Sequence, residues 1–358
     1  MQLDLIAGTR PNFVKIAAII YAIENYGQNI NYRFIHTGQH YDDSLSENIF
    51  KDLELPSPHF NLGVGSGSQA RQSAAIMLAY EKLLLEEKPD LCMVVGDVTS
   101  SMVCAITAKK LNIKIAHVEA GLRSYDWTMP EEVNRVLIDS IADYFFTTTP
   151  EASKTLLDAG KDKDHVYFVG NTMIDTLLRF QSKFKAPNIW KEVNLKPQQY
   201  LLLTLHRPGN VDEEKQLEIT INSILKNSRN LPVIFPVHPR TVVIMKDLSF
   251  EADNFYLTNP LGYLEFNYLV QNAKAVLTDS GGITEETTVL SVPCLTLREN
   301  TERPETIKLG TNELIGTNPE NIAQALHKLF KDNWKQGNIP EYWDGKTGER
   351  IIKSLITI

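Results

Sequence analysis

One stretch decides the fold of this chain: Ala275-Val-Leu-Thr-Asp-Ser280-Gly281-Gly282-Ile-Thr-Glu285-Glu286, an apolar strand that runs into a glycine pair and then a helix. Strand–turn–helix units of this kind build doubly wound parallel sheets. Free N–H groups at a helix start bind anions, and paired glycines let a phosphate approach the backbone. Carboxylates one turn later suit sugar hydroxyls. The stretch predicts the diphosphate end of a nucleotide or nucleotide-sugar site; the alternative is a plain helix cap.

Short apolar strands and helical patterns alternate along most of the chain, which predicts parallel sheets with helical crossovers. A polar segment over about residues 184–199 interrupts the alternation, which then resumes. We therefore expect two doubly wound α/β domains, residues 1–170 and residues 171–341, with a C-terminal helix at about 342–358 that packs back on the first. The expected strands are Leu3–Ala7, Tyr32–Thr37, Leu91–Gly96, Lys114–Val118, Tyr144–Thr147, Val166–Val169, Tyr200–Thr204, Val233–Pro236, Phe255–Thr258, Ala275–Thr278 and Cys294–Leu297.

Composition narrows the class of protein. A length of 358 residues suits two domains, and a net charge of -8 argues against a nucleic-acid surface. No apolar run approaches the ~20 residues that span a bilayer, and the opening residues read as a strand and not as a signal peptide. The three cysteines lie in apolar contexts typical of buried thiols. We expect a cytoplasmic protein without membrane insertion and without a nucleic-acid partner.

Three carboxylates fall at successive positions along one predicted sheet edge. Asp97 and Glu119 directly follow apolar strands, and Glu131 opens a helix after Pro130. Crowded carboxylates raise each other's pKa, which suits general acid and base catalysis. For Glu131 an alternative stays open, because acidic residues favour the first turn of a helix and Arg135 is spaced to form an i,i+4 pair.

Basic residues also follow predicted strands. Arg10 and Lys15 flank the start of the first helix and would clamp a diphosphate, although solvated surface charge is the alternative. His206 and His238 each lie beyond a strand with an arginine nearby, which suits phosphate or sugar hydroxyls. For His238 a structural role is equally open.

Three further segments carry polar or aromatic clusters. The histidines of His36-Thr-Gly-Gln-His40 follow a strand, so the helical face of a zinc site is absent and a loop that lines the ligand site is favoured. Tyr263 and Phe266 offer faces for a base to stack on, although core packing is favoured for Tyr263. The dense polar run from Arg298 to Glu305 indicates a ligand-facing loop.

In order, these segments closely resemble the non-hydrolysing UDP-N-acetylglucosamine 2-epimerases. They span nearly the whole chain, and their combination is specific although each alone is weak. The matching segments are Gly8-Thr-Arg-Pro-Asn-Phe-Val-Lys15, Thr37-Gly-Gln-His-Tyr-Asp42, Val95-Gly-Asp97-Val-Thr-Ser100, His117-Val-Glu-Ala-Gly-Leu-Arg123, Pro130-Glu-Glu-Val-Asn-Arg135, Val237-His-Pro-Arg240, Asp279-Ser-Gly-Gly-Ile-Thr-Glu-Glu286 and Arg298-Glu-Asn-Thr-Glu-Arg-Pro-Glu305.

The resemblance implies the glycosyltransferase-B fold, two Rossmann-like domains that face each other across a cleft with a UDP-sugar between them. It implies reversible C2 epimerisation of UDP-N-acetylglucosamine to UDP-N-acetylmannosamine, by elimination and re-addition of UDP through a bound 2-acetamidoglucal, supplying sugars for cell-surface polysaccharide. The C2 proton is not acidic, so elimination needs a base and cations for the departing diphosphate. No redox cofactor and no metal is required, and we expect a homodimer.

Residue by residue, the resemblance makes Asp97, Glu119, Glu131 and His206 the catalytic groups. Ser280, Gly281 and Gly282 match the phosphate loop, Glu286 the ribose contact and Phe266 the uracil position. The remaining residues expected to bind UDP or substrate are Arg10, Lys15, Arg135, His238 and Arg303.

Two departures from the family pattern leave the regulation and the exact sugar open. The chain has His206-Arg207-Pro208-Gly209 where many bacterial members have His-Arg-Arg-Glu, a loop that contributes to activation by a second UDP-N-acetylglucosamine, so the resemblance does not extend to that regulation. Asn12 replaces a commoner glutamate, which would fit a subgroup acting on a modified sugar such as a 2,3-diacetamido uronate. A hydrolysing 2-epimerase, a UDP-sugar glycosyltransferase and a nucleotide-sugar-binding regulator without turnover would also fit the sequence.

Overall fold

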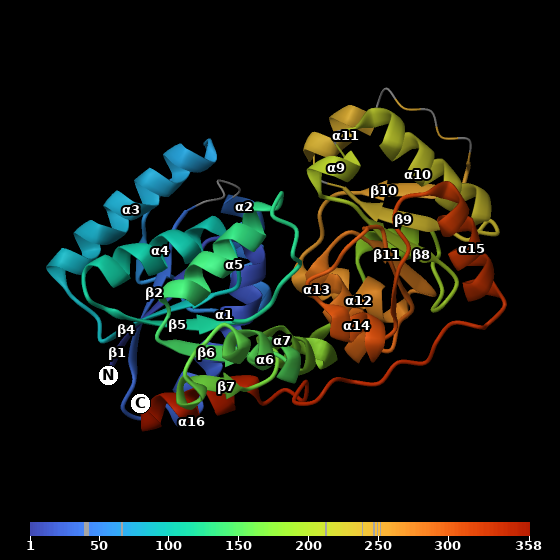
Figure 1. Ribbon diagram of the computed structural model, residues 1–358. Coiled ribbons are helices and arrows are strands. Elements are labelled where there is room, and N and C mark those ends of the chain that lie inside the picture. The colour runs from blue at the N-terminus through green and yellow to red at the C-terminus, as the bar shows by residue number, and fades with distance from the viewer. Residues whose placement is uncertain are drawn as a thin grey trace. The chain divides into compact units, whose positions relative to one another are not determined.

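The computed structural model of the protein describes residues 1–38, 43–65, 67–211, 213–237, 239–245, 248, 250 and 252–358. The chain divides into two compact units (Figure 1): unit 1 is Met1–Arg179 with Glu341–Ile358, and unit 2 is Phe180–Pro340. Each unit contains one sheet, and neighbouring strands pair in parallel in both. The expected class of two Rossmann-like, doubly wound domains is confirmed.

The sheet of unit 1 has the strand order β3-β2-β1-β4-β5-β6-β7. The chain winds outward from β1 to β3, returns to β4 on the other side of β1, and winds outward again. The direction of winding therefore reverses between β1 and β4, the place where doubly wound sheets bind ligands. The strands are β1 (Gln2–Ala7), β2 (Asn31–His36), β3 (Phe60–Asn61), β4 (Leu91–Val95), β5 (Lys114–Val118), β6 (Tyr144–Thr147) and β7 (Val166–Phe168).

Helices cover the sheet of unit 1. On one side α3 (Gln69–Glu86), α4 (Thr99–Lys110) and α5 (Pro130–Ile141) lie next to one another, and α1 (Arg10–Tyr26) packs with α16 (Thr347–Thr357). A Cβ on Gly348 would lie 2.5 Å from the Ala18 carbonyl oxygen, so this close approach of the two helices requires glycine. The other helices of unit 1 are α2 (Asp43–Asp52), α6 (Pro150–Asp158) and α7 (Thr172–Phe180).

Contacts of α7 explain where unit 1 ends. Thr176 donates a hydrogen bond to the Val14 carbonyl oxygen at 2.7 Å, and Asp175 accepts one from the Gly348 N–H at 2.7 Å. These bonds join α7 to α1 and to the start of α16. The boundary after Arg179 therefore falls one helix later than residue 170, where the sequence places it.

The sheet of unit 2 has the order β10-β9-β8-β11-β12-β13 and is buried on both faces. Leu201 and Leu203 face one apolar cluster with α10 and α15, while Leu202 faces a second with α12, as the two-residue period of a strand requires. Its elements are α8 (Asn188–Glu192), β8 (Leu201–Thr204), α9 (Pro208–Val211), α10 (Glu214–Asn227), β9 (Val233–Pro236), α11 (Pro239–Met245), β10 (Phe255–Thr258), α12 (Tyr263–Asn272), β11 (Ala275–Thr278), α13 (Gly281–Val289), β12 (Cys294–Thr296), α14 (Pro304–Lys308), β13 (Asn312–Leu314) and α15 (Pro319–Phe330).

Across the described residues, no helix combines the length and the apolar character that a bilayer crossing needs.

Candidate functional site

The polar residues predicted in unit 1 lie together at the carboxyl ends of its strands. Arg10 follows β1, Asp97 follows β4 and Glu119 follows β5, and these three strands are neighbours. Because the strands are parallel, their carboxyl ends lie together. The fold alone therefore places these three residues at the carboxyl end of the sheet.

Glu119 forms a buried ion pair with Lys15. Lys15 Nζ lies 2.6 Å from Glu119 Oε2, and the two side chains are only 11% and 2% exposed. The Glu119 backbone has a φ of +70°, a region that non-glycine residues rarely adopt and that recurs at functional sites. Nearby Gly96 has a φ of +65°, and a Cβ there would lie 3.1 Å from Lys15 Nζ. The pair therefore fits a space that glycine keeps open.

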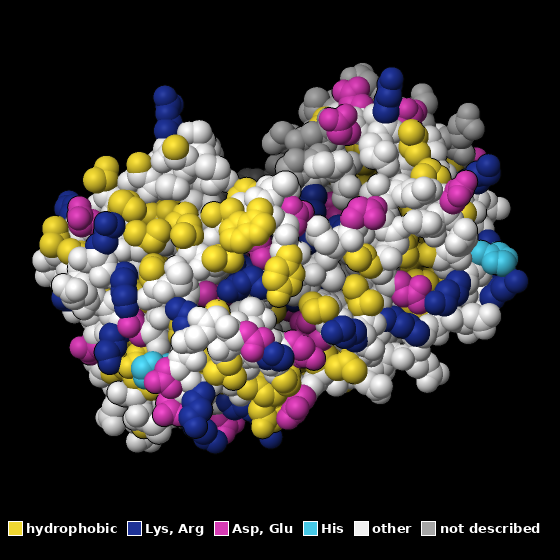
Figure 2. Space-filling view, viewed as in Figure 1, with side chains coloured by type: hydrophobic (Ala, Val, Ile, Leu, Met, Phe, Trp, Pro, Cys, Tyr) yellow, Lys and Arg dark blue, Asp and Glu magenta, His cyan; other side chains and the backbone are white. Residues whose placement is uncertain are grey.

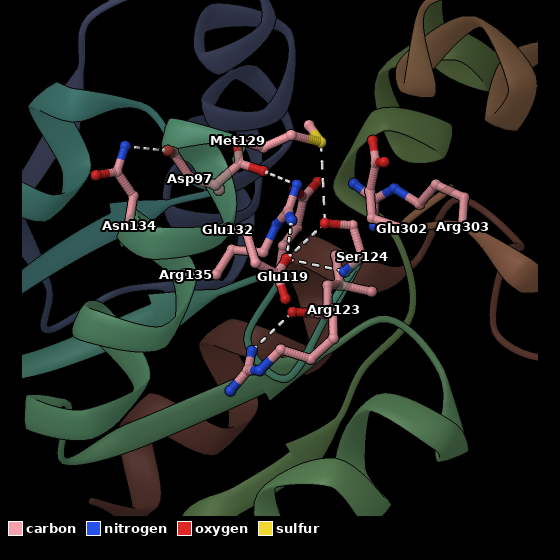
Figure 3. Close-up of polar contacts among 12 residues, drawn as sticks. Asp97, Glu119, Arg123, Ser124, Met129, Glu132, Asn134, Arg135, Glu302 and Arg303 are labelled. Atoms are coloured by element: carbon pink, nitrogen blue, oxygen red, sulfur yellow. Dashed lines mark hydrogen bonds and ion pairs between the residues drawn. The ribbon is translucent and has the colours of Figure 1, made fainter. Parts of the chain in front are cut away.

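Asp97 is paired with Arg135 of α5 (Figure 3). Arg135 Nη2 lies 2.6 Å from Asp97 Oδ2, and Nη1 bonds to Glu132. Asn134 donates to the Asp97 carbonyl oxygen at 2.8 Å, so both the backbone and the side chain of Asp97 are held by α5. The Asp97 side chain stays 26% exposed, which leaves it accessible to a ligand.

Glu132 is a structural carboxylate that sequence reasoning left without a role. It accepts hydrogen bonds from Ser124 N, Ser124 Oγ and Tyr125 N at 2.8 to 3.0 Å, as Figure 3 shows for Ser124. Burial opposes ionisation, but these bonds and the Arg135 charge lower the pKa of Glu132 below its ordinary value. Arg135 thus pairs with the residue three positions earlier, whereas Glu131 was its expected partner. Glu131 is half-buried on the same helix turn.

A buried carboxylate–histidine pair ties the ends of β4 and β5 together. His117 Nδ1 lies 2.7 Å from Asp139 Oδ1, and its Nε2 lies 3.1 Å from the Gly96 carbonyl oxygen. The other oxygen of Asp139 accepts from Arg123 at 2.6 Å and from the Gly121 N–H at 3.1 Å. Although burial works against ionisation, His117 and Arg123 lower the pKa of Asp139. This network fixes the two segments that carry Asp97 and Glu119.

Asn12 supports the turn after β1. Its Oδ1 accepts from Gly8 N at 3.3 Å and from Thr9 N at 3.2 Å, and its Nδ2 donates to the Val95 carbonyl oxygen at 2.9 Å. The residue is 1% exposed. Its contacts explain why an amide fits this position, and they give no direct reason to connect it with a modified sugar. Neighbouring Arg10 is half-buried at the start of α1.

In unit 2, Asp279 holds His206. Asp279 follows β11, His206 follows the adjacent β8, and Asp279 Oδ1 lies 2.6 Å from His206 Nδ1. Asp279 also accepts from the Arg207 N–H at 2.9 Å and from Asn210 at 3.0 Å. Burial would raise the pKa of Asp279, but His206 and these donors lower it to about 2. With Nδ1 bonded to Asp279, the His206 ring is held in place while its side chain stays 61% exposed.

The glycine turn lies beside these residues. Ser280 precedes α13, which begins at Gly281, and all three residues Ser280–Gly282 are partly exposed. Glu286 lies one turn further on and is 3% exposed, with Asn267 Nδ2 3.4 Å from its Oε1. Burial raises the pKa of Glu286 to about 7. A ligand that bonded to this carboxylate would favour its ionised form.

The other predicted residues of unit 2 differ in their surroundings. Arg303 Nε lies 2.9 Å from Glu285 Oε1, and both side chains are buried. Phe266 is partly buried against an apolar cluster, and Tyr263 is 7% exposed, so its core role fits. His238 lies outside the described residues.

Among the described residues, nothing indicates a metal site at the histidines of residues 36–40. His36 is 7% exposed and packs edge-on against Phe13 at 5.1 Å, and His40 lies outside the described residues. Within the part of the chain that the structure describes, no group of three or more histidine, cysteine, aspartate or glutamate side chains is placed to hold a metal ion.

Parallel sheets, a glycine turn at a helix start and carboxylates at strand ends are features that the sequence motifs connect with nucleotide-sugar enzymes, and comparisons with known proteins place the chain in that class. The family model described as UDP-N-acetylglucosamine 2-epimerase matches residues 23–356. The UDP-N-acetylglucosamine 2-epimerase of Methanocaldococcus jannaschii is 41% identical, over 99% of both chains. The chain belongs to the UDP-N-acetylglucosamine 2-epimerase family.

Two further comparisons concern structure and substrate. A crystal structure of the Methanocaldococcus jannaschii UDP-GlcNAc 2-epimerase in complex with UDP-GlcNAc and UDP superimposes with a TM-score of 0.90, at 41% identity and 100% coverage of both chains. The UDP-2,3-diacetamido-2,3-dideoxy-D-glucuronate 2-epimerase of Pseudomonas aeruginosa is 34% identical, over 99% of both chains. The family therefore includes relatives named for two different sugars.

Proposed function

We propose that this enzyme interconverts UDP-N-acetylglucosamine and UDP-N-acetylmannosamine without hydrolysing either. A base removes the C2 proton, the C1–O bond breaks, and UDP leaves with the bonding electrons to give 2-acetamidoglucal. UDP then adds back to C1, and C2 receives a proton on its opposite face. The product would supply N-acetylmannosamine-type sugars for cell-surface polysaccharide.

The observation that carries the proposal is the group of carboxylates that follow the strands β4 and β5 of unit 1. Glu119 and Asp97 are each bound to a cation, so both carboxylates are fixed in place. Elimination and re-addition serve two faces of C2, which calls for at least two groups that transfer protons. Asp97, Glu119 and Glu131 are the proposed groups.

In unit 2 the proposal assigns UDP to the turn at Ser280–Gly282. The N–H groups at the start of α13 suit a diphosphate, and Glu286 lies one turn along the helix for the ribose hydroxyls. His206, oriented by Asp279, is the remaining catalytic group. Phe266, Arg303, Arg10, Lys15, Arg135 and His238 complete the proposed set that binds UDP and substrate.

A proton NMR time course in deuterated water tests the function. UDP-N-acetylglucosamine alone should yield UDP-N-acetylmannosamine with deuterium at C2, and deuterium should also enter C2 of the remaining substrate. A glycosyltransferase would leave the substrate unchanged without an acceptor. A hydrolysing enzyme would release free N-acetylmannosamine and UDP, and a regulator would show no exchange.

A second candidate substrate is a UDP-2,3-diacetamido uronate, because a relative named for that sugar is 34% identical over 99% of both chains. The two substrates should be compared side by side by kcat/KM. A higher kcat/KM for the uronate would replace the first proposal, while the C2 chemistry would stay the same.

We also propose a homodimer formed through unit 1. Figure 2 shows hydrophobic side chains gathered over the region of α3, α4 and α5. Leu78 and Leu85 of α3 are 67% and 71% exposed, and Leu137 of α5 is 40% exposed. Large exposed apolar patches mark interaction sites, and two-fold dimers are the commonest soluble assembly. Sedimentation should show a dimer that Leu78→Glu with Leu85→Glu converts to monomers.

The enzyme is proposed to work in the cytoplasm. Cys92, Cys104 and Cys294 are free and buried. Unpaired thiols are typical of proteins kept in a reducing compartment. Fractionation of cells that express a tagged copy would test the location.

A further inference from the structure

A carboxylate of unit 2 lies against the glycine turn that should receive the diphosphate. A Cβ built on Gly281 would stand 2.4 Å from Glu302 Oε1. Glu302 is itself 7% exposed, so its carboxylate lies within the unit and not in solvent. Figure 3 shows Glu302 next to Arg303 on the segment before α14. The side chain that a Cβ on Gly281 would meet therefore carries the same sign of charge as the expected ligand.

Arg298 neutralises this carboxylate. Arg298 Nη2 lies 2.7 Å from Glu302 Oε2, and the two side chains are 5% and 9% exposed. The same nitrogen lies 3.3 Å from Asn300 Oδ1. A buried carboxylate is tolerated only with such a partner, so the Arg298 charge accounts for how Glu302 can lie at the turn.

The guanidinium of Arg298 is incompletely satisfied. Its Nη1 is buried and has no hydrogen-bond partner among the described residues. Buried donors in native proteins are nearly always bonded, and an exception at a binding site points to a group that arrives with the ligand. A diphosphate offers several acceptor oxygens and matches the forked geometry of arginine.

The neighbouring Arg303 has a different kind of ion-pair partner. Its partner, Glu285, belongs to α13 and is fully buried. The partner of Arg298, by contrast, meets the turn only through the end of a flexible side chain. Glu302 reaches the turn with the carboxylate of its side chain, whereas Glu285 is itself a residue of helix α13.

We propose that Glu302 is a placeholder for the diphosphate and that Arg298 is a diphosphate-binding residue. Without ligand, Glu302 lies on the turn at Gly281 and holds Arg298 in position. The diphosphate of UDP displaces the carboxylate from the turn and accepts hydrogen bonds from Arg298. This inference rests on the proposed function, because it takes UDP as the ligand of the turn.

The test compares the affinities of UDP and uridine by isothermal titration calorimetry on the full chain. Removing the competing charge in Glu302→Gln should tighten UDP binding by roughly 10-fold, the scale of one partly screened like-charge contact. Arg298→Ala should weaken UDP binding by roughly 10-fold or more. Uridine lacks the phosphates, so its affinity should not change in either variant.

Controls separate this inference from folding and from the proposed function. Glu313→Gln removes a carboxylate of unit 2 that pairs with Lys328, and it should leave both affinities unchanged. Glu302→Ala should tighten UDP binding as Glu302→Gln does. Unchanged or weaker UDP binding in both Glu302 variants, with uridine binding intact and the wild type epimerising, overturns this inference alone. A wild type that neither binds UDP nor epimerises overturns the proposed function as well.

Discussion

The two units present their charged residues in different ways. In unit 1 the residues form ion pairs between separate elements, such as Lys15 with Glu119 and Arg135 with Asp97, and most of these side chains are buried. In unit 2 they surround a partly exposed backbone turn, and His206 is 61% exposed. Carboxylates fixed in position suit proton transfer, while a partly exposed turn suits the binding and release of a ligand. We therefore expect changes in unit 1 to affect turnover and changes in unit 2 to affect binding.

The largest expected effect concerns Glu119. Glu119→Gln keeps the shape of the side chain but removes the charge that pairs with Lys15 and the capacity to accept a proton. Turnover should fall by roughly 10²-fold or more, while the affinity for UDP stays close to that of the wild type. Steady-state kinetics and calorimetry on one protein preparation measure both values.

A matched control for Glu119 is available in the same unit. Glu151 is an exposed carboxylate in the first turn of α6, and Glu151→Gln should leave turnover unchanged. Near-normal turnover in Glu119→Gln would remove this residue from the proposed catalytic set.

Arg10 could break the comparison, because it belongs to unit 1 but is proposed to bind UDP. Loss of a charge-assisted hydrogen bond in Arg10→Ala should weaken UDP binding by about 10- to 150-fold, equivalent to roughly 1.5–3 kcal/mol. Titration calorimetry with UDP measures the change. Unchanged affinity would exclude Arg10 from the binding site and leave the division between the units intact.

Asp279 should link the stability of unit 2 to pH. Its folded-state pKa of about 2 lies below the ordinary value of 3.8, so the ionised form stabilises the fold. That contribution, on the order of 2 kcal/mol, should be fully present above about pH 4 and lost as the pH falls toward 2. Urea unfolding from pH 7 to pH 2 should show a decline that Asp279→Asn lacks. A parallel decline in the variant would rule out Asp279 as its source.

The smallest expected effect separates two adjacent carboxylates of α5. Glu131→Gln should cost well under 1 kcal/mol of stability, since a half-buried charge in a first turn contributes only a helix-dipole interaction. Glu132→Gln should cost clearly more, because it weakens the bonds to Ser124, Tyr125 and Arg135. Thermal unfolding of both variants gives the two values. Equal losses would show that the two positions are equivalent.

The sequence predicted most of the sheet framework because buried parallel strands are short apolar runs. Lys114–Val118 and Ala275–Thr278 were predicted to the residue. The strands β3 and β13 were missed, because they have only two and three residues at sheet edges and no apolar run. Local patterns do not specify pairings of this length.

The site shows a similar division. Positions at strand ends were visible as polar residues after apolar runs, so Asp97, Glu119 and His206 could be predicted. Two supporting carboxylates were not recognised: Asp279, which holds His206, was read only as part of the turn, and Asp139, which holds His117, lies inside an ordinary helix pattern. Ion pairs between distant segments depend on how the elements pack, and one sequence carries no direct record of that packing.

The position of α16 has a consequence for the order in which this protein is completed. Unit 2 is one continuous segment, whereas unit 1 needs residues from both parts of the chain that flank it. Domains tend to fold as they are synthesised, so unit 2 can fold before α16 has been synthesised and can pack on α1. The unit that the ribosome begins first is thus finished last. If synthesis stalled after Pro340, α16 would be missing and the face of α1 around Ala18 would stay exposed. Chaperones would then meet a chain in which the strands that carry Asp97 and Glu119 are present but α16 does not yet pack on α1.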